Sequence, residues 1–119
     1  MTIAVSVPDS VEGRVALAAA VDEARSMETD LVAINLSLHK LDLPDEDCGV
    51  KITVVDRSGR GDRDPVDAIL DEVAEHGATR LVIGVKRRSR TGKALFGSVS
   101  QRLLIESPIP VLAVKTPEE

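Results

Sequence analysis

Short apolar runs alternate along this chain with longer segments in which apolar residues recur at helical spacing. Runs that are rich in β-branched residues and closed by turn-forming residues predict strands. There are five of them: Thr2–Val7, Asp30–Leu36, Val50–Val55, Arg80–Val85 and Val111–Val114. Most are apolar almost throughout, which is typical of parallel strands that are covered on both faces.

Three helices are predicted between these strands. The first begins at Ser10, a favourable N-cap residue, and runs to about Met27. Its inner face is expected to hold Val11, Val15, Ala18, Ala19 and Val21. The spacing of these apolar residues predicts that the helix packs on one face of a sheet.

The second helix has a clear start signal. Asp64 stands at the cap position, Pro65 at the first helical position, and the helix is expected to stop at Gly77. A third helix is predicted over Ser98–Ser107. Strands that alternate with helices indicate an α/β fold, with a five-stranded and mainly parallel sheet between helices on both faces.

Length and composition narrow the possible partners. The chain has 119 residues, enough for one domain with its own core, which we expect to cover residues 1–119. Phe96 is the only aromatic residue and the net charge is −5. A protein of this composition lacks the aromatic platforms and the positive charge that bind nucleic acids, so no nucleic-acid partner is expected.

The sequence also bears on the compartment. Cys48 is the only cysteine and cannot form an internal disulfide, which favours a reducing compartment. The N-terminus lacks the features of a signal peptide, and no apolar run approaches the length that spans a membrane. We therefore expect a cytoplasmic protein with no membrane partner.

Charge is unevenly distributed along the chain. Residues 86–93 carry five cations and no acid. This segment follows Gly84, near the end of the fourth predicted strand, and precedes Gly97-Ser98 at the start of the last helix. Glycine lets a backbone approach an anion, cations attract it, and a helix N-terminus offers unpaired N–H groups. The order of these parts predicts a phosphate site, with a solvated basic loop as the alternative.

At this point the chain resembles the universal stress protein family. The family signature is a glycine, two residues, a second glycine, nine residues, and then Gly-Ser or Gly-Thr. Gly84 and Gly97-Ser98 match its outer parts at the right spacing, and Pro65–Leu70 and Ser107–Val114 resemble two further family segments. The resemblance implies a Rossmann-like sheet of the adenine nucleotide α-hydrolase type, with strand order 3-2-1-4-5. It also implies a homodimer that pairs through the edge strand Val111–Val114.

The chain departs from the family pattern in three places. Arg87 stands where the signature has its middle glycine, and its side chain either fills the phosphate space or contacts a phosphate. Pro8 stands where the family often has an aspartate, which displaces Asp9 by one residue. Only Ser37–Gly49 lies between the second and third strands, where such domains usually have an additional helix.

Two hypotheses follow from these departures. The favoured one is a stress-response protein that acts by binding and whose degenerate loop does not hold ATP tightly, so that there is no cofactor. The alternative is a protein that binds ATP or another adenine nucleotide. Its ligand would then meet backbone groups and cations of the loop and two residues near the nucleoside: Gly84, Arg87, Arg88, Lys93, Gly97, Ser98, Asp9 and Leu36. No general base is placed by spacing, so an enzyme is not expected.

Rival functions fit less well. A P-loop needs a glycine at the position of Arg87 and a hydroxyl after Lys93, where the chain has Ala94. A receiver domain would use Asp9, Asp56 and Lys115, but the acidic pair, the hydroxyl after the fourth strand and the last helix are missing. The single cysteine and the two histidines show no spacing of metal ligands.

Overall fold

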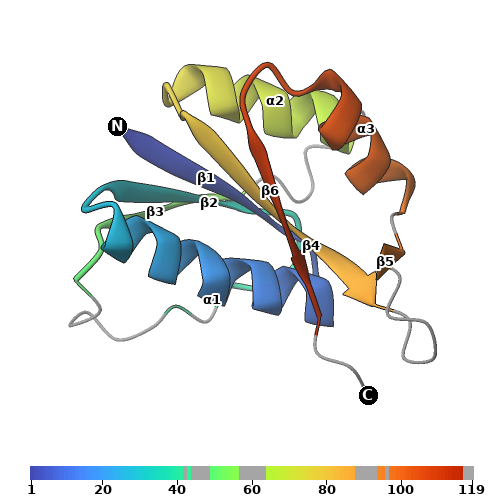
Figure 1. The fold of residues 1–119 in the computed structure, drawn as a ribbon, viewed down its shortest axis with the longest axis horizontal. Coiled ribbons are helices and arrows are strands. Elements are labelled where there is room, and N and C mark those ends of the chain that lie inside the picture. The colour runs from blue at the N-terminus through green and yellow to red at the C-terminus, as the bar shows by residue number, and fades with distance from the viewer. Residues whose placement is uncertain (42, 44–48, 57–63, 88–93, 96, 117–119) are drawn as a thin grey trace.

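The computed structural model describes residues 1–41, 43, 49–56, 64–87, 94–95 and 97–116. Figure 1 shows a single sheet with α1 on one face and with α2 and α3 on the other. The elements in chain order are β1 (Thr2–Val7), α1 (Val11–Ser26), β2 (Asp30–Asn35), β3 (Ile52–Asp56), α2 (Pro65–Glu75), β4 (Arg80–Arg87), β5 (Ala94–Leu95), α3 (Ser98–Glu106) and β6 (Val111–Lys115).

The sheet has the predicted order. β3, β2, β1 and β4 lie side by side, and β6 follows on the outer side of β4, all of them parallel. The fifth predicted strand is therefore β6, and the predicted order 3-2-1-4-5 is confirmed. The winding direction reverses between β1 and β4, so a crevice opens beyond the carboxyl ends of these two strands.

The fourth strand is longer than the sequence predicted. It does not end at Val85 but continues to Arg87, because Lys86 pairs with Leu95 and Arg87 with Ala94 in an antiparallel ladder. This pairing creates the short strand β5, which the sequence did not predict. The first two residues of the basic segment thus belong to the stem of a hairpin, since residues 94–95 return to pair with them.

The predicted inner face of α1 is mostly wrong. Only Val21 of the five predicted residues is buried, whereas Val11 is 46% exposed. The residues that face the sheet are Ala16, Leu17, Ala20, Val21 and Ala24. Alanine at every fourth position lets the helix lie close to Ile3, Val5 and Val7 of β1, so these alanines form the buried stripe together with Leu17 and Val21.

The second helix follows its prediction closely. The side chain of Asp64 caps it by accepting a hydrogen bond from the backbone N–H of Val66 (2.9 Å), and Pro65 is the first helical residue. Arg102 of α3 reaches back to the Asp64 carboxylate and also donates from Nε to Glu106 (2.8 Å). This network joins the start of α2 to α3, and the two helices together cover the second face of the sheet.

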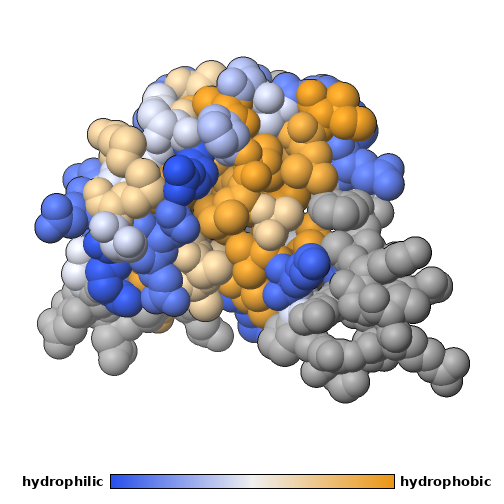
Figure 2. Space-filling view, viewed as in Figure 1, coloured by the Kyte–Doolittle hydropathy of each residue, from blue (hydrophilic) through white to orange (hydrophobic). Residues whose placement is uncertain are grey.

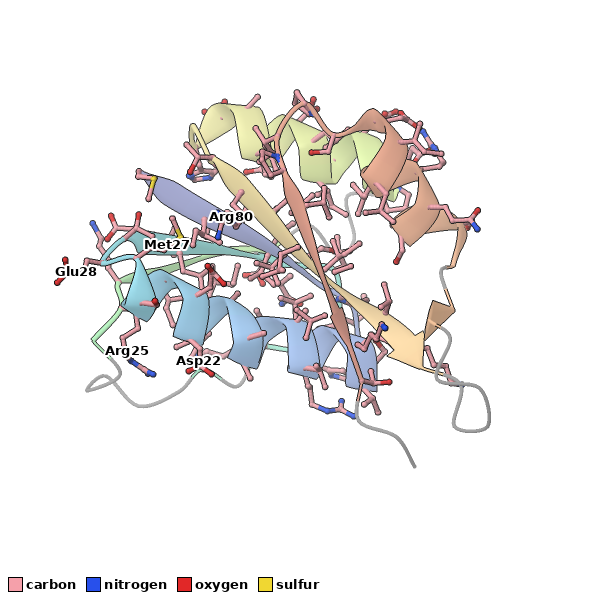
Figure 3. The ribbon with its side chains drawn as sticks, viewed as in Figure 1. Asp22, Arg25, Met27, Glu28 and Arg80 are labelled. Carbon is pink, nitrogen blue, oxygen red and sulfur yellow. The ribbon has the colours of Figure 1, made fainter. Side chains whose placement is uncertain are left out.

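The far end of the sheet is tied to the end of α1. Arg80, the first residue of β4, donates to Glu23 Oε1 (2.6 Å) and lies against the sulfur of Met27 (3.4 Å). Figure 3 shows Arg80 beside Met27. This ion pair and the C-terminal end of α1 thus lie at the opposite end of the strands from the crevice.

The outer edge of the sheet is apolar. β6 pairs with β4 on one side and with no other described strand on the other side. Figure 2 shows an apolar band that follows the course of β6 and continues toward α3. Leu112 of β6 is 36% exposed, and Leu104 and Ile105 of α3 are 41% and 82% exposed.

Candidate functional site

A cleft of about 410 Å³ lies at the crevice between β1 and β4. The starts of two helices meet at this cleft, because α1 follows β1 directly and α3 follows the loop after β4. Its described lining is formed by Pro8, Ser10, Glu12, Gly84, Val85, Lys86, Gly97 and Ser100. The crevice is where open parallel sheets bind their ligands, so this is the candidate site.

Two glycines bring α1 against the crevice. A β-carbon on Gly84 would overlap the carbonyl oxygen of Glu12 and lie 2.7 Å from its carbonyl carbon. A β-carbon on Gly13 would overlap the carbonyl oxygen of Pro8 in the same way. Gly84 therefore allows α1 to pack against β4, in addition to its predicted role in a phosphate site. A glycine within a predicted helix, such as Gly13, is the signal that could have shown the close approach.

The two helix starts differ in their hydrogen bonding. The hydroxyl of Ser10 caps α1 by accepting from the N–H of Gly13 (3.2 Å). The N-cap of α3 is Gly97, which offers no side chain, so the first-turn N–H groups of α3 have no side-chain cap. Ser98, which the sequence also allowed as a simple helix cap, is the first residue of the helix instead. The uncapped start of α3 is the part of the cleft that most favours an anion.

The charges of the described lining do not add to this preference for an anion. The lining contains one acid, Glu12, and one cation, Lys86. Arg87 is the last residue of β4, and only its backbone is described. Arg88 and Lys93 lie outside the described residues. The cationic field that the sequence predicted for the phosphate thus stays a prediction.

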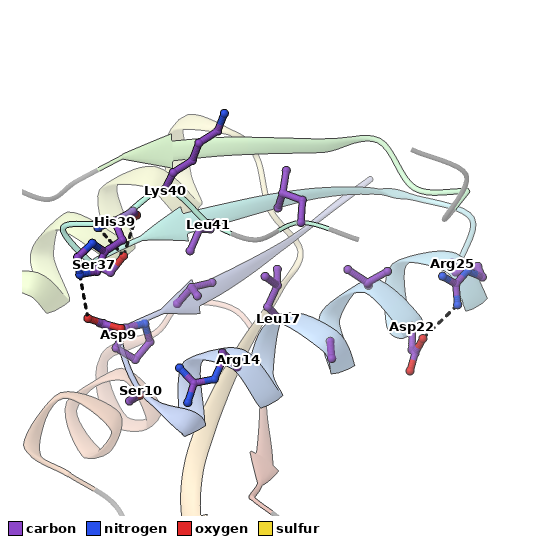
Figure 4. A pocket seen from close by; sticks show the side chains of 15 residues that line it. Asp9, Ser10, Arg14, Leu17, Asp22, Arg25, Ser37, His39, Lys40 and Leu41 are labelled. Atoms are coloured by element: carbon purple, nitrogen blue, oxygen red, sulfur yellow. Dashed lines mark hydrogen bonds and ion pairs between the residues drawn. The ribbon is translucent and has the colours of Figure 1, made fainter. Parts of the chain in front are cut away.

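The two residues predicted to meet the nucleoside are not among the described residues that line the cleft. Asp9 is exposed, and its Oδ2 is 3.8 Å from Nε2 of His39, in a groove beside α1 (Figure 4). Leu36 is half-buried and packs into the core on the α2 and α3 side of the sheet. The structure therefore brings Gly84 and Gly97 together in the cleft, with Ser98 at the start of α3. Asp9 stands between Pro8 and Ser10, which both line the cleft, so its predicted role stays a prediction, as does that of Leu36.

A buried asparagine that the sequence analysis did not single out organises the loop after β2. Asn35, at the end of this strand, is 1% exposed. Its Nδ2 donates to Asp56 Oδ1 (2.7 Å) and to the carbonyl of His39 (2.8 Å), and its Oδ1 accepts from the N–H of Ser37 (3.0 Å). This network fixes the start of the short connection between β2 and β3 and brings His39 to Asp9.

The described residues contain no group of three or more histidine, cysteine or acidic side chains that could hold a metal ion. His39 is exposed and His76 lies at the end of α2, where its Nε2 is 3.4 Å from Glu72 Oε1. None of the described helices is both long and apolar enough to span a membrane.

Comparison with known proteins points to one family. The model of the universal stress protein family matches residues 49–115. A universal stress protein of Mycolicibacterium smegmatis is 34% identical over 118 aligned residues, which cover 87% of this chain and 88% of that protein. The solved structure of a universal stress protein from Archaeoglobus fulgidus superposes with a TM-score of 0.72 at 26% identity, over 97% of this chain and 98% of the other.

A further solved structure shares the fold and contains a nucleotide. It is the universal stress protein from Archaeoglobus fulgidus in complex with dAMP, with a TM-score of 0.68 and 24% identity. The alignment covers 97% of this chain and 98% of that one. At this level of identity the likeness concerns the fold.

Proposed function

This chain belongs to the universal stress protein family, and from this membership and the geometry of the crevice we propose that it acts in the stress response by binding, without tight binding of ATP. It works as a homodimer in the cytoplasm and catalyses no reaction. The cleft between β1 and β4 keeps the shape of a nucleotide site but has lost parts of its chemistry.

The observation that carries this proposal is the pairing of Arg87 with Ala94. Arg87 stands at the middle glycine of the family signature, the residue that lets the loop close over phosphates in relatives that hold ATP. In this chain the backbone at this position is extended and belongs to a strand. A strand-paired arginine cannot supply the free glycine backbone that a phosphate would approach.

Two further features support the same conclusion. Pro8 lines the cleft at the position where the family often has an aspartate, and the nearby Asp9 lies beside His39 instead. The carbonyl of Glu12 leaves no room for a side chain at position 84. Helix packing therefore accounts for Gly84, and this glycine does not by itself indicate a bound ligand. The uncapped start of α3 remains able to attract an anion weakly.

The proposed homodimer rests on the exposed edge of β6. An apolar edge strand offers unpaired backbone groups to a second strand, and isolated proteins normally protect such an edge. The apolar side chains on α3 and β6 described above would be covered by the same contact. The proposed compartment rests on the single cysteine of the chain.

The experiment that tests the proposal has two parts. The natively purified protein is denatured and the released small molecules are identified by mass spectrometry, and then ATP and dAMP are titrated into the protein by calorimetry. We expect no nucleotide in the released fraction and no saturation by ATP below the millimolar range. Co-purified adenine nucleotide, or micromolar affinity for ATP, would favour the nucleotide-binding alternative and overturn the proposal.

A further inference from the structure

A second cavity lies beside α1, on the face of the sheet that this helix covers. Its volume is about 660 Å³, which is within the range of pockets that hold small organic molecules. The floor is formed by buried apolar side chains, among them Val7, Leu17 and Val21. Leu41 and Leu43, from the connection after β2, form an apolar wall opposite the helix. We refer to this cavity as the α1 groove.

The α1 groove follows the length of the helix. Its lining extends along the helix from Ser10 to Arg25, which corresponds to about 22 Å at the rise of an α-helix. The resemblance to the family implied an additional helix between the second and third strands, but the described residues of this connection contain none. α1 is therefore the only described helix on this face, and the space beside it is bordered by a short connection.

Charged groups lie at both ends of the α1 groove (Figure 4). At the far end Arg25 is paired with Asp22, 3.1 Å away. At the near end Arg14 lies beside Ser10, and it forms no ion pair with any residue in the described part of the chain. Asp9, at the same end, is close to His39. The near end therefore offers a guanidinium to an anionic group.

We propose that the α1 groove binds a linear amphiphilic anion, with its acyl chain along Leu17 and Val21 and its carboxylate at Arg14. The apolar floor and wall match a chain of methylene groups, which is attracted in proportion to the apolar surface that it buries. A guanidinium binds a carboxylate with two parallel hydrogen bonds, which sets the direction of the chain in the groove. The groove adjoins the cleft at β1 and β4, since Pro8 and Ser10 line both, but Leu17, Val21 and Arg14 line the groove alone. The proposal therefore does not depend on nucleotide binding in the cleft.

Calorimetric titration of octanoate, decanoate and dodecanoate, each below its micellar concentration, tests the site. We expect the affinity to rise about fourfold for each added methylene, because each buried methylene contributes a similar free energy. Dodecyltrimethylammonium, which has the same chain and a positive head group, should bind about tenfold more weakly than dodecanoate. Amide shifts in NMR spectra should map to residues 10–25 and to the connection after β2.

A pair of neighbouring alanines gives a matched control. Ala18 lines the α1 groove and is exposed, so Ala18→Asp places a charge in the groove without burying it in the core. Ala19 is on the same helix but does not line the groove. Ala18→Asp should weaken dodecanoate binding by about tenfold or more, and Ala19→Asp should leave it within about twofold. Thermal melting of both variants confirms that they fold.

The head group is tested at Arg14. Arg14→Gln should weaken dodecanoate but not dodecyltrimethylammonium, and Arg14→Lys should restore part of the affinity because it keeps the charge. No detectable binding of dodecanoate at its highest monomeric concentration would overturn the proposal. Binding that Ala18→Asp leaves unchanged, or shifts that map to the β6 edge, would overturn it as well.

Discussion

Gly84 of β4 and Glu12 of α1 are in such close contact that no side chain fits between them. A β-carbon at Gly84 would overlap the carbonyl oxygen of Glu12. Since β4 and α1 each carry part of the lining of the cleft, this contact holds two walls of the candidate site together. The same contact explains why a glycine is needed in the middle of this strand, between Ile83 and Val85.

The first prediction is that Gly84→Ala destabilises the protein by about 1–3 kcal/mol, the usual cost of forcing extra volume into a packed site. Chemical denaturation measures the free energy of unfolding. Gly97→Ala is the control, because a β-carbon on Gly97 would meet no atom within 4 Å. Its effect should stay below about 1 kcal/mol, as expected for a change at an N-cap. Equal losses for the two variants would contradict the packing role of Gly84.

Asp64 makes the stability depend on pH. The hydrogen bond from Arg102 and the N–H of Val66 both favour the charged carboxylate, and they lower the pKa of Asp64 below its usual value. A carboxyl whose pKa is lower in the folded state stabilises the fold above its unfolded pKa of about 4 and loses this contribution as the pH falls through the folded value. The contribution of the Asp64 charge to the free energy of unfolding should therefore be complete at neutral pH.

The second prediction compares Asp64→Asn with the natural protein. Asparagine keeps the helix cap but loses the charge that pairs with Arg102. The variant should melt at a lower temperature than the natural protein at pH 7, and the difference should shrink steadily below about pH 4. Asp64→Ala, which also loses the cap, should melt lower still at neutral pH. A difference that grows on acidification would contradict the assigned direction.

The five parallel strands of this fold could be predicted from the sequence because most of their residues are apolar. The start of α2 was predictable for a local reason, since the Asp64-Pro65 cap acts within one turn of the helix. The buried face of α1 was not, because it is defined by alanines whose burial depends on how closely the helix approaches the sheet. The exposed Val11 and the half-buried Val15 are more hydrophobic than the buried Ala16, Ala20 and Ala24, so a choice that follows the valines selects the wrong stripe.

The candidate site could be predicted only in part, because some of its elements are positioned by contacts between residues that are distant in the sequence. The spacing of Gly84 and Gly97 indicated the cleft, which both residues line. The hairpin between β4 and β5 arises from pairing across a loop, and the network of Asn35 joins residues 21 positions apart in the chain. Such contacts leave no periodic signal in the sequence.

The third prediction concerns this asparagine. Asn35→Ala removes the amide that donates to Asp56 and to the carbonyl of His39 and that accepts from the N–H of Ser37. Among the described residues, only the carbonyl of His39 keeps another partner, the hydroxyl of Ser37 (2.9 Å). Loss of a buried group with several partners should lower the free energy of unfolding by about 2 kcal/mol or more. Ser37→Ala removes only the hydroxyl of the same network and should cost about half as much. If Asn35→Ala is neutral in denaturant unfolding, the network does not stabilise the connection.

The fourth prediction tests the proposed homodimer at the sheet edge. Leu112→Asp places a charge in the apolar band along β6 and should convert the dimer to a monomer at micromolar concentration, because an unpaired charge is costly in an interface. Leu38→Asp is the matched control, since Leu38 is a leucine that is 83% exposed in the connection after β2. Sedimentation equilibrium gives the mass. A natural protein that is already monomeric, or a dimer that resists Leu112→Asp, would contradict the proposed edge.

The last prediction separates a lost nucleotide site from a modified one. Arg87→Gly restores the middle glycine of the family signature at the end of the β4 stem, where Arg87 pairs with Ala94. If the arginine and its extended backbone exclude the phosphates, the change should strengthen ATP binding by about tenfold, the contribution of one or two charge-assisted backbone contacts. Lys115→Gly is the matched control, because it also removes a cation and places a glycine at the end of a strand of the same sheet, but Lys115 does not line the cleft. ATP affinity that falls in Arg87→Gly would mean that Arg87 contacts the phosphates, and the protein would then be a nucleotide binder with an arginine in its phosphate loop.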